Sequence, residues 1–135
     1  MSKYLITYAA VITLLIVLDA LWLGLIAKSF YQAKIGHLMT EAPNFYAAII
    51  FYLIYAAGLV AFVIVPYNTL QNCTSLVIFA ALYGLCTYST YALTNLAILK
   101  GWPVELTIID VSWGIFITVI SAFVGKFAFN FLAFQ

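Results

Sequence analysis

Four long apolar segments, each poor in charged residues, constrain this chain more than any other feature of its sequence. They cover about residues 4–27, 45–65, 76–99 and 104–131, and each is close to the 20 or so residues that an α-helix needs to cross a bilayer. Apolar and polar residues do not alternate along them, which argues against membrane β-strands. Because only 7% of the residues are charged and 67% are hydrophobic, the chain lacks the polar surface of a soluble domain. The sequence therefore predicts an all-α integral membrane protein, in which residues 1–135 form a single membrane domain with four transmembrane helices.

Small side chains in the second and third segments indicate where helices pack closely. The second segment carries no charge, and its Ala57 and Ala61 lie four residues apart on one helical face. Ala80 and Gly84 repeat this spacing in the third segment. Because lipid chains are as apolar as the side chains around them, small residues of this kind let two helix backbones approach each other in a membrane. We expect both pairs to be packing surfaces without chemistry.

The longest connection, residues 28–44, is also the most polar. Its apolar side chains follow a helical spacing while its lysines lie elsewhere, so we expect a short amphipathic helix in this first loop, at the membrane surface. Such a helix could act as a lid. His37 and Glu41 lie four residues apart, but no third ligand follows at a suitable spacing. We therefore predict a hydrogen-bonded or hydrated pair there, and no metal site.

Charge and motif content exclude several functions. The net charge is +1 and arginine is absent, so nothing in the chain is suited to the phosphates of a nucleic acid, and no nucleic-acid partner is predicted. On one helix Cys73 and Cys86 would lie about 20 Å apart, which excludes an intrachain disulfide. A Gly-rich phosphate loop, a zinc motif and a Ser/His/Asp order are all missing from the sequence. No cofactor is predicted, and an enzyme is less favoured than a binding protein.

Three energetically costly polar residues are predicted to lie at the same depth in the membrane. Asp19 lies near the end of the first segment, Asn95 near the end of the third, and Asp110 near the beginning of the fourth. The helical rise of about 1.5 Å per residue places all three about 6 to 12 Å from the surface that carries the first and third loops. An ionised carboxylate in hydrocarbon costs at least about 2.5 kcal/mol, so these side chains must face protein or water. The shared depth predicts a polar pocket lined by these three residues.

Aromatic residues accompany these polar groups in a repeated pattern. Asp19 is followed three residues later by Trp22, and Asp110 in the same way by Trp113. The second half of the third segment places tyrosine, threonine and asparagine side chains on one helical face. The predicted ligand-binding residues are Asp19, Trp22, Tyr31, Tyr88, Tyr91, Asn95, Asp110 and Trp113, and the predicted lid or entrance residues are His37, Glu41, Trp102 and Glu105.

Two carboxyl groups at one depth are compatible with several kinds of chemistry. They could share a proton, bind a cationic or polyhydroxyl ligand, hold a hard metal ion, or act as general acid and base. Alternatively, they bond to tyrosine, asparagine, tryptophan and water and only fix the packing of the helices. Because no metal-binding motif is present, we assign no metal.

Several motifs resemble those of a known family. They are DALWLG at residues 19–24, Tyr31 with IGHLM at 35–39, TYALTNLAILKGWP at 90–103 and DVSWG at 110–114. Together they resemble a family of small, uncharacterised bacterial membrane proteins, a predicted membrane domain of unknown function. The resemblance implies a four-helix protein of the bacterial inner membrane, and genes for fatty-acid modification and light stress near those of family members favour a lipid ligand. In the family pattern, the position of Ala92 is usually an aspartate.

Three functional hypotheses follow. The first, which we favour, is a protein that binds a membrane lipid or another amphiphilic small molecule in the pocket of Asp19, Asn95 and Asp110. The second is a small proton-coupled transporter that works as a homodimer. The third is a membrane enzyme that acts on lipids, and it has the least support because no nucleophile stands out.

Overall fold

The computed structural model describes residues 1–68 and 73–131, and this part of the chain is mostly helical, with no strand. Its elements are α1 (Ser2–Leu21) with a π-helical turn (Trp22–Ile26), α2 (Lys28–Ile35) with a 3-10 turn (Gly36–Leu38), α3 (Phe45–Leu59) with a second π-helical turn (Val60–Ile64), α4 (Val65–Asn68), α5 (Cys73–Ile98) and α6 (Val104–Phe131).

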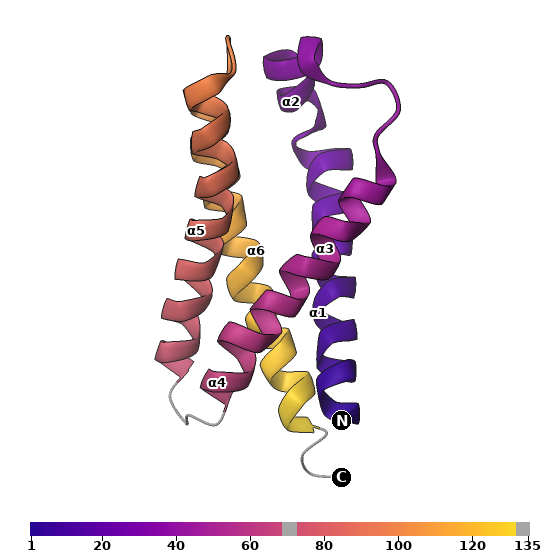
Figure 1. Ribbon diagram of the computed structural model, residues 1–135, viewed down its shortest axis with the longest axis vertical. Coiled ribbons are helices and arrows are strands. Elements are labelled where there is room, and N and C mark those ends of the chain that lie inside the picture. The colour runs from indigo at the N-terminus through magenta and orange to yellow at the C-terminus, as the bar shows by residue number, and fades with distance from the viewer. Residues whose placement is uncertain (69–72, 132–135) are drawn as a thin grey trace.

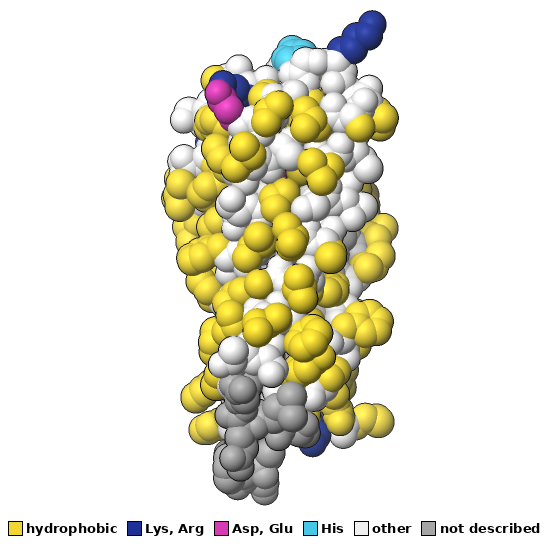
Figure 2. All heavy atoms as spheres, turned by 90° about the vertical axis from the view of Figure 1, so that its left-hand side faces the viewer, with side chains coloured by type: hydrophobic (Ala, Val, Ile, Leu, Met, Phe, Trp, Pro, Cys, Tyr) yellow, Lys and Arg dark blue, Asp and Glu magenta, His cyan; other side chains and the backbone are white. Residues whose placement is uncertain are grey.

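Among the described residues, four continuous helices are long and apolar enough to cross a membrane: Ser2–Ile26, Phe45–Asn68, Cys73–Ile98 and Val104–Phe131. Viewed from the side of α5, hydrophobic side chains cover the length of the molecule, while charged and histidine side chains gather at its two ends (Figure 2). This distribution suits a helix bundle that is surrounded by acyl chains and meets water only at its ends. The predicted fold, four transmembrane helices with a short helix in the first loop, is confirmed, and the protein is an integral membrane protein.

Helix α6 lies at the centre of the bundle. It packs against α1 on one side and along α5 on the other, and it buries a face of small and polar residues that includes Asp110, Gly114 and Thr118. Helix α3 crosses the bundle at a slant (Figure 1). Its first part lies against α1, whereas its continuation over Val60–Asn68 packs on α5 and α6. The slant leaves the first half of α3 separated from α5.

Helices α5 and α6 approach each other closely at Gly84. A Cβ atom there would lie 2.7 Å from the carbonyl oxygen of Gly114 and 3.0 Å from the Cα of Ile115, so only a hydrogen fits between the two backbones. Ala80 is also fully buried. The predicted packing surface of Ala80 and Gly84 is thus confirmed.

The matching prediction for the second span is wrong within this chain. Ala57 and Ala61 are exposed, and α3 instead buries Tyr55, Ala56 and Leu59. The slanted path of α3 turns this other face of the helix toward the bundle.

The helix that contains α3 also runs past residue 65, where the predicted second span ends. It continues through Pro66 to Asn68. A proline lacks an N–H group and its ring clashes with the carbonyl four residues earlier in a regular helix. The wider π-helical turn directly before α4 relieves that clash, which explains why the proline is tolerated.

A tight turn joins α5 to α6. Gly101 has a φ angle of 76°, the only positive φ angle in the described part of the chain. Glycine adopts this left-handed conformation without steric cost, and it commonly ends a helix in this way. Trp102 follows, is buried, and donates from Nε1 to the hydroxyl of Thr107 at 3.1 Å. The turn therefore fixes the beginning of α6, and with it the position of Asp110.

Candidate functional site

A pocket of about 370 Å³ lies in the half of the bundle near the first and third loops. Helices α1, α3, α5 and α6 all contribute to it, together with α2 from the first loop. Aromatic side chains form most of the wall, and the carboxyl groups of Asp19 and Asp110 are part of it. The lining residues are Asp19, Trp22, Leu23, Tyr31, Ala48, Phe51, Tyr52, Tyr55, Thr87, Tyr88, Tyr91, Asp110 and Trp113.

Asp19 is held by two hydrogen bonds from different helices. The Tyr52 hydroxyl of α3 donates to Oδ2 at 2.9 Å, and the Trp113 indole N–H of α6 donates to Oδ1 at 2.8 Å. The Asp19 side chain is almost completely buried, with 6% exposed. Because both oxygens already accept a bond, the orientation of this carboxyl group is fixed by the surrounding helices.

Asp110 has a different environment, because its partner comes from the first loop. The Tyr31 hydroxyl of α2 donates to Asp110 Oδ1. Burial, and then the bond to Asp110, raise the pKa of Tyr31 above its ordinary range, so the hydroxyl keeps its proton and acts as the donor. Among the described residues, no group donates to the second oxygen of Asp110. This oxygen is the least satisfied acceptor of the two carboxyl groups.

The two Asp-x-x-Trp motifs meet across the interface of α1 and α6. Since these helices are antiparallel, the aspartate of each motif lies level with the tryptophan of the other, and the rings of Trp22 and Trp113 stack with centroids 4.4 Å apart and planes 7° from parallel. Trp113 bonds to Asp19, but Trp22 does not make the matching bond to Asp110. The Trp22 indole N–H is buried without a partner of normal hydrogen-bond geometry in the described residues, although it lies near the Tyr31 hydroxyl.

Deeper in the bundle, a lining tyrosine forms a hydrogen bond to a buried threonine of α6. The hydroxyls of Tyr55 and Thr118 lie 2.5 Å apart. Thr118 also bonds to the carbonyl of Gly114, and a hydroxyl has one hydrogen to give, so Tyr55 is the donor to Thr118. Tyr88 from α5 stands at a right angle to the Tyr55 ring, with centroids 6.0 Å apart. Hydrogen bonds to α6 therefore fix the Tyr55 ring, against which Tyr88 packs.

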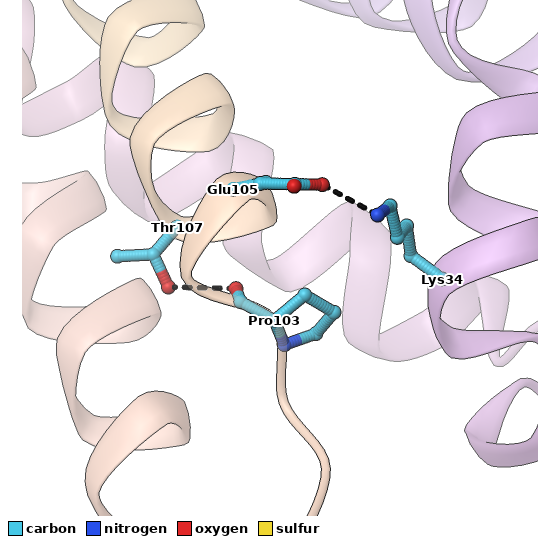
Figure 3. Close-up of polar contacts among 4 residues, drawn as sticks. All are labelled: Lys34, Pro103, Glu105 and Thr107. Carbon is cyan, nitrogen blue, oxygen red and sulfur yellow. Dashed lines mark hydrogen bonds and ion pairs between the residues drawn. The ribbon is translucent and has the colours of Figure 1, made fainter.

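Helix α2 is attached to the beginning of α6 on the loop side of the pocket. Besides the bond from Tyr31 to Asp110, Lys34 forms an ion pair with Glu105, 2.5 Å between Nζ and Oε2 (Figure 3). Glu105 lies in the first turn of α6. In the same turn, the Thr107 hydroxyl donates to the carbonyl of Pro103. The two links hold α2 over the carboxyl groups, as a lid would be held.

The two links are expected to differ in strength. Lys34 and Glu105 are 36% and 67% exposed, and ion pairs in water contribute about 0–1 kcal/mol. We therefore expect Lys34→Gln to change the free energy of unfolding by at most about 1 kcal/mol. Tyr31→Phe should cost more, about 1–3 kcal/mol, because it leaves a buried acceptor without a donor. Thermal unfolding of both variants in the same detergent measures this order. Equal losses would contradict it.

Most of the predicted ligand-binding residues come together. The pocket is lined by all of them except one, Asn95, which lies near Tyr91 one turn closer to the membrane surface. Tyr91 itself is at the rim, 55% exposed, with its ring edge against Trp102. Ala92, the position of the aspartate in the family pattern, is fully buried and lies outside the lining.

The predicted entrance residues lie at the same end of the bundle, with different surroundings. Glu105 pairs with Lys34 as described, and Trp102 is buried behind Tyr91. His37 is exposed, and its ring lies next to the backbone of Gly101. Glu41 is exposed, and the helical spacing that would pair it with His37 does not form, because the 3-10 turn ends at Leu38.

Sequence reasoning missed the contribution of α3. Phe51, Tyr52 and Tyr55 all line the pocket, although Ala57 and Ala61 were the only residues of the second span to which a role was assigned. A signal was present, because Tyr52 and Tyr55 lie well inside a transmembrane segment, away from the interface that tyrosine prefers. A phenol hydroxyl at that depth needs a partner inside the protein.

Comparison with known proteins gives one family. The family model described as "Predicted membrane protein (DUF2177)" matches residues 4–127, a stretch that includes every lining residue of the pocket. No curated protein and no solved structure matches the chain significantly.

Proposed function

The chain belongs to the DUF2177 family of predicted membrane proteins, and from its pocket we propose that it binds an amphiphilic molecule, a lipid or lipid-like compound, inside the membrane. The family is uncharacterised, as the motifs of the sequence predicted. The observation that carries the proposal is the arrangement of Asp19 and Asp110 in one aromatic pocket within the transmembrane region. We further propose the bacterial inner membrane as its location, as the family resemblance implies.

The size and lining of the pocket support this function. A volume of about 370 Å³ lies within the range of about 300–1,000 Å³ that is usual for small-molecule sites. Such sites combine a mainly apolar wall with a few polar groups that orient the ligand. Here the aromatic wall would hold the apolar body of an amphiphile, and the carboxyl groups would receive its head group. A head group that donates hydrogen bonds fits the free oxygen of Asp110.

The position of the rim supports access from the bilayer. Phe51 of α3 and Tyr91 of α5 are 43% and 55% exposed, and both lie in transmembrane helices, where exposure means contact with acyl chains. The helices that carry these two residues, α3 and α5, diverge in this half of the bundle. On the side of the loops, α2 is attached over the carboxyl groups by Tyr31 and Lys34. A molecule dissolved in the bilayer could therefore reach the pocket between α3 and α5 without crossing water.

A substitution at the rim tests the proposal. Ala48 lines the pocket and is exposed, so Ala48→Phe should fill the pocket with little strain on the fold. The protein is purified in a mild detergent, its bound small molecules are extracted, and they are quantified by mass spectrometry. We expect wild type to carry at least one amphiphile that Ala48→Phe carries in at least about tenfold lower amount.

Ala47→Phe is the matched control for this experiment. Ala47 is exposed on the same helix but does not line the pocket, so the variant should carry the same amphiphile as wild type. If wild type and both variants carry the same molecules in the same amounts, those molecules cover the outer surface of the bundle. The binding function would then be wrong.

A further inference from the structure

We infer that the head group bound in this pocket is a cation, so that the ligand is an organic amine or ammonium compound with an apolar body; the inference rests on the proposed binding function. The first observation is the charge of the wall. Its titratable groups are the carboxyls of Asp19 and Asp110 and several tyrosines, and no lysine, arginine or histidine lines it. The nearby Lys34 lies outside the lining and is paired with Glu105.

The pocket therefore lacks the opposite charge that buried carboxylates normally have. Buried charged groups in proteins are paired, coordinated or neutralised by a proton. The donors to the two carboxyl groups, Tyr31, Tyr52 and Trp113, are all neutral. A bound cation would supply the missing charge, whereas an anionic head group, such as a phosphate or a fatty-acid carboxylate, would meet like charge without any base to offset it.

The aromatic wall favours the same class of ligand. The negative face of an aromatic ring attracts a cation, and the attraction grows when water is excluded. Rings from five elements line the pocket together with the carboxyl groups: Trp22, Tyr31, Tyr52, Tyr88 and Trp113. Neutral head groups gain much less from such rings. Aromatic side chains together with acidic ones, and no basic ones, form the combination by which proteins recognise organic cations.

The two aspartates would have different roles toward this ligand. Both oxygens of Asp19 already accept hydrogen bonds, so Asp19 contributes its charge. Asp110 accepts a bond from Tyr31 on Oδ1, and Oδ2 has no donor among the described residues. A primary ammonium group would donate to Oδ2 of Asp110 and form a charge-assisted hydrogen bond. A quaternary ammonium group has no hydrogen to donate, so we expect it to bind more weakly.

Three probes with the same tail test the inference: dodecylamine, dodecanol and dodecanoate. The full chain is placed in nanodiscs of zwitterionic lipid at pH 7, where the amine is charged, and binding is followed by the fluorescence of the tryptophans, two of which line the pocket. The fluorescence change of Ala48→Phe, whose pocket is filled, measures the background from probe that binds outside the pocket. We expect dodecylamine to bind at least about tenfold more tightly than dodecanol, and dodecanoate to bind most weakly.

Two variants test whether the preference for dodecylamine depends on the carboxylate of Asp110. Asp110→Asn keeps the shape of the side chain and should weaken dodecylamine binding at least about tenfold while leaving dodecanol binding nearly unchanged. Glu41→Gln removes an exposed carboxylate at the same end of the bundle that neither lines the pocket nor takes part in the two links of α2, so it should leave dodecylamine binding within about twofold of wild type. Equal effects of the two variants would mean that the amine is drawn only by the general charge of this surface, which would overturn the inference.

The outcomes separate the inference from the function on which it rests. If dodecanol or dodecanoate binds as tightly as dodecylamine, and Ala48→Phe abolishes that binding, the preference for cations is wrong and the amphiphile-binding function stands. If none of the three probes binds to wild type above the Ala48→Phe signal, both are wrong. The comparison of probes on wild type decides the matter even if Asp110→Asn does not fold.

Discussion

Gly84→Ala should lower the free energy of unfolding of this protein by about 1–3 kcal/mol, the usual cost of adding a methyl group to a tightly packed site. The new Cβ would lie 2.7 Å from the carbonyl oxygen of Gly114 and 3.0 Å from the Cα of Ile115. These are backbone atoms, which cannot move aside as the end of a side chain can. Helices α5 and α6 would have to separate along their longest interface. Thermal unfolding in detergent should show a midpoint several degrees below that of wild type.

Other glycines provide matched controls for this substitution. A Cβ at Gly24 or Gly36 has no atom within 4 Å, so Gly24→Ala and Gly36→Ala should not lower the unfolding midpoint. Gly58 is an intermediate case, because the atom that a Cβ would meet is the hydroxyl end of the Tyr83 side chain, which can rotate away. If Gly84→Ala unfolds at the same temperature as Gly24→Ala, α5 and α6 are not packed as closely as described.

The depth of the site could be predicted from the sequence because helical geometry and the cost of burial act together. Asp19 and Asp110 are too costly to face acyl chains, and the fixed rise per residue sets their level in the membrane. Both do line one pocket. Tyr31, in the helix predicted for the first loop, was predicted to be a ligand-binding residue, and its hydroxyl donates a hydrogen bond to Asp110. These predictions needed only the period of the helix and the chemistry of single side chains.

The direction of α3 could not be predicted in the same way. In a membrane, both the lipid-facing and the protein-facing sides of a helix are apolar, so the sequence of α3 carries little information about which face is inside. The slant of the helix then decides that Tyr52 and Tyr55 face the pocket while Ala57 and Ala61 face outward. These features depend on how several helices fit together.

Asn95 illustrates a limit of helical periodicity. It shares a broad face of α5 with Thr87, Tyr88 and Tyr91, all of which line the pocket. That face is wider than the pocket, and the turn that contains Asn95 lies beyond the rim, near the loop at Gly101. Periodicity predicts the direction of a side chain around a helix but not where along the helix a cavity ends.

Asp19→Ala is expected to cost about 2–4 kcal/mol of unfolding free energy, a large effect for the loss of one small side chain. It removes the acceptor for both Tyr52 and Trp113, and each buried donor left without a partner costs about 1–3 kcal/mol. Release from the cost of burying the carboxyl group offsets part of this loss. Asp19→Asn keeps one acceptor oxygen and should be intermediate. Thermal or denaturant unfolding in detergent measures the order of the three proteins.

A double-mutant cycle with Tyr52→Phe shows whether this loss comes from the hydrogen bonds themselves. If the Tyr52 hydroxyl is stabilised by Asp19, removing it from the Asp19→Ala background should cost about 1 kcal/mol less than removing it from wild type, because its partner is already gone. Tyr8→Phe is the control, since the Tyr8 hydroxyl donates to the Leu53 carbonyl at 3.1 Å and shares no bond with Asp19. Its effect should add to that of Asp19→Ala within about 0.5 kcal/mol. Strict additivity in both cycles would mean that Asp19 does not hold α3 against α1, and that the wall of the pocket is built by apolar packing alone.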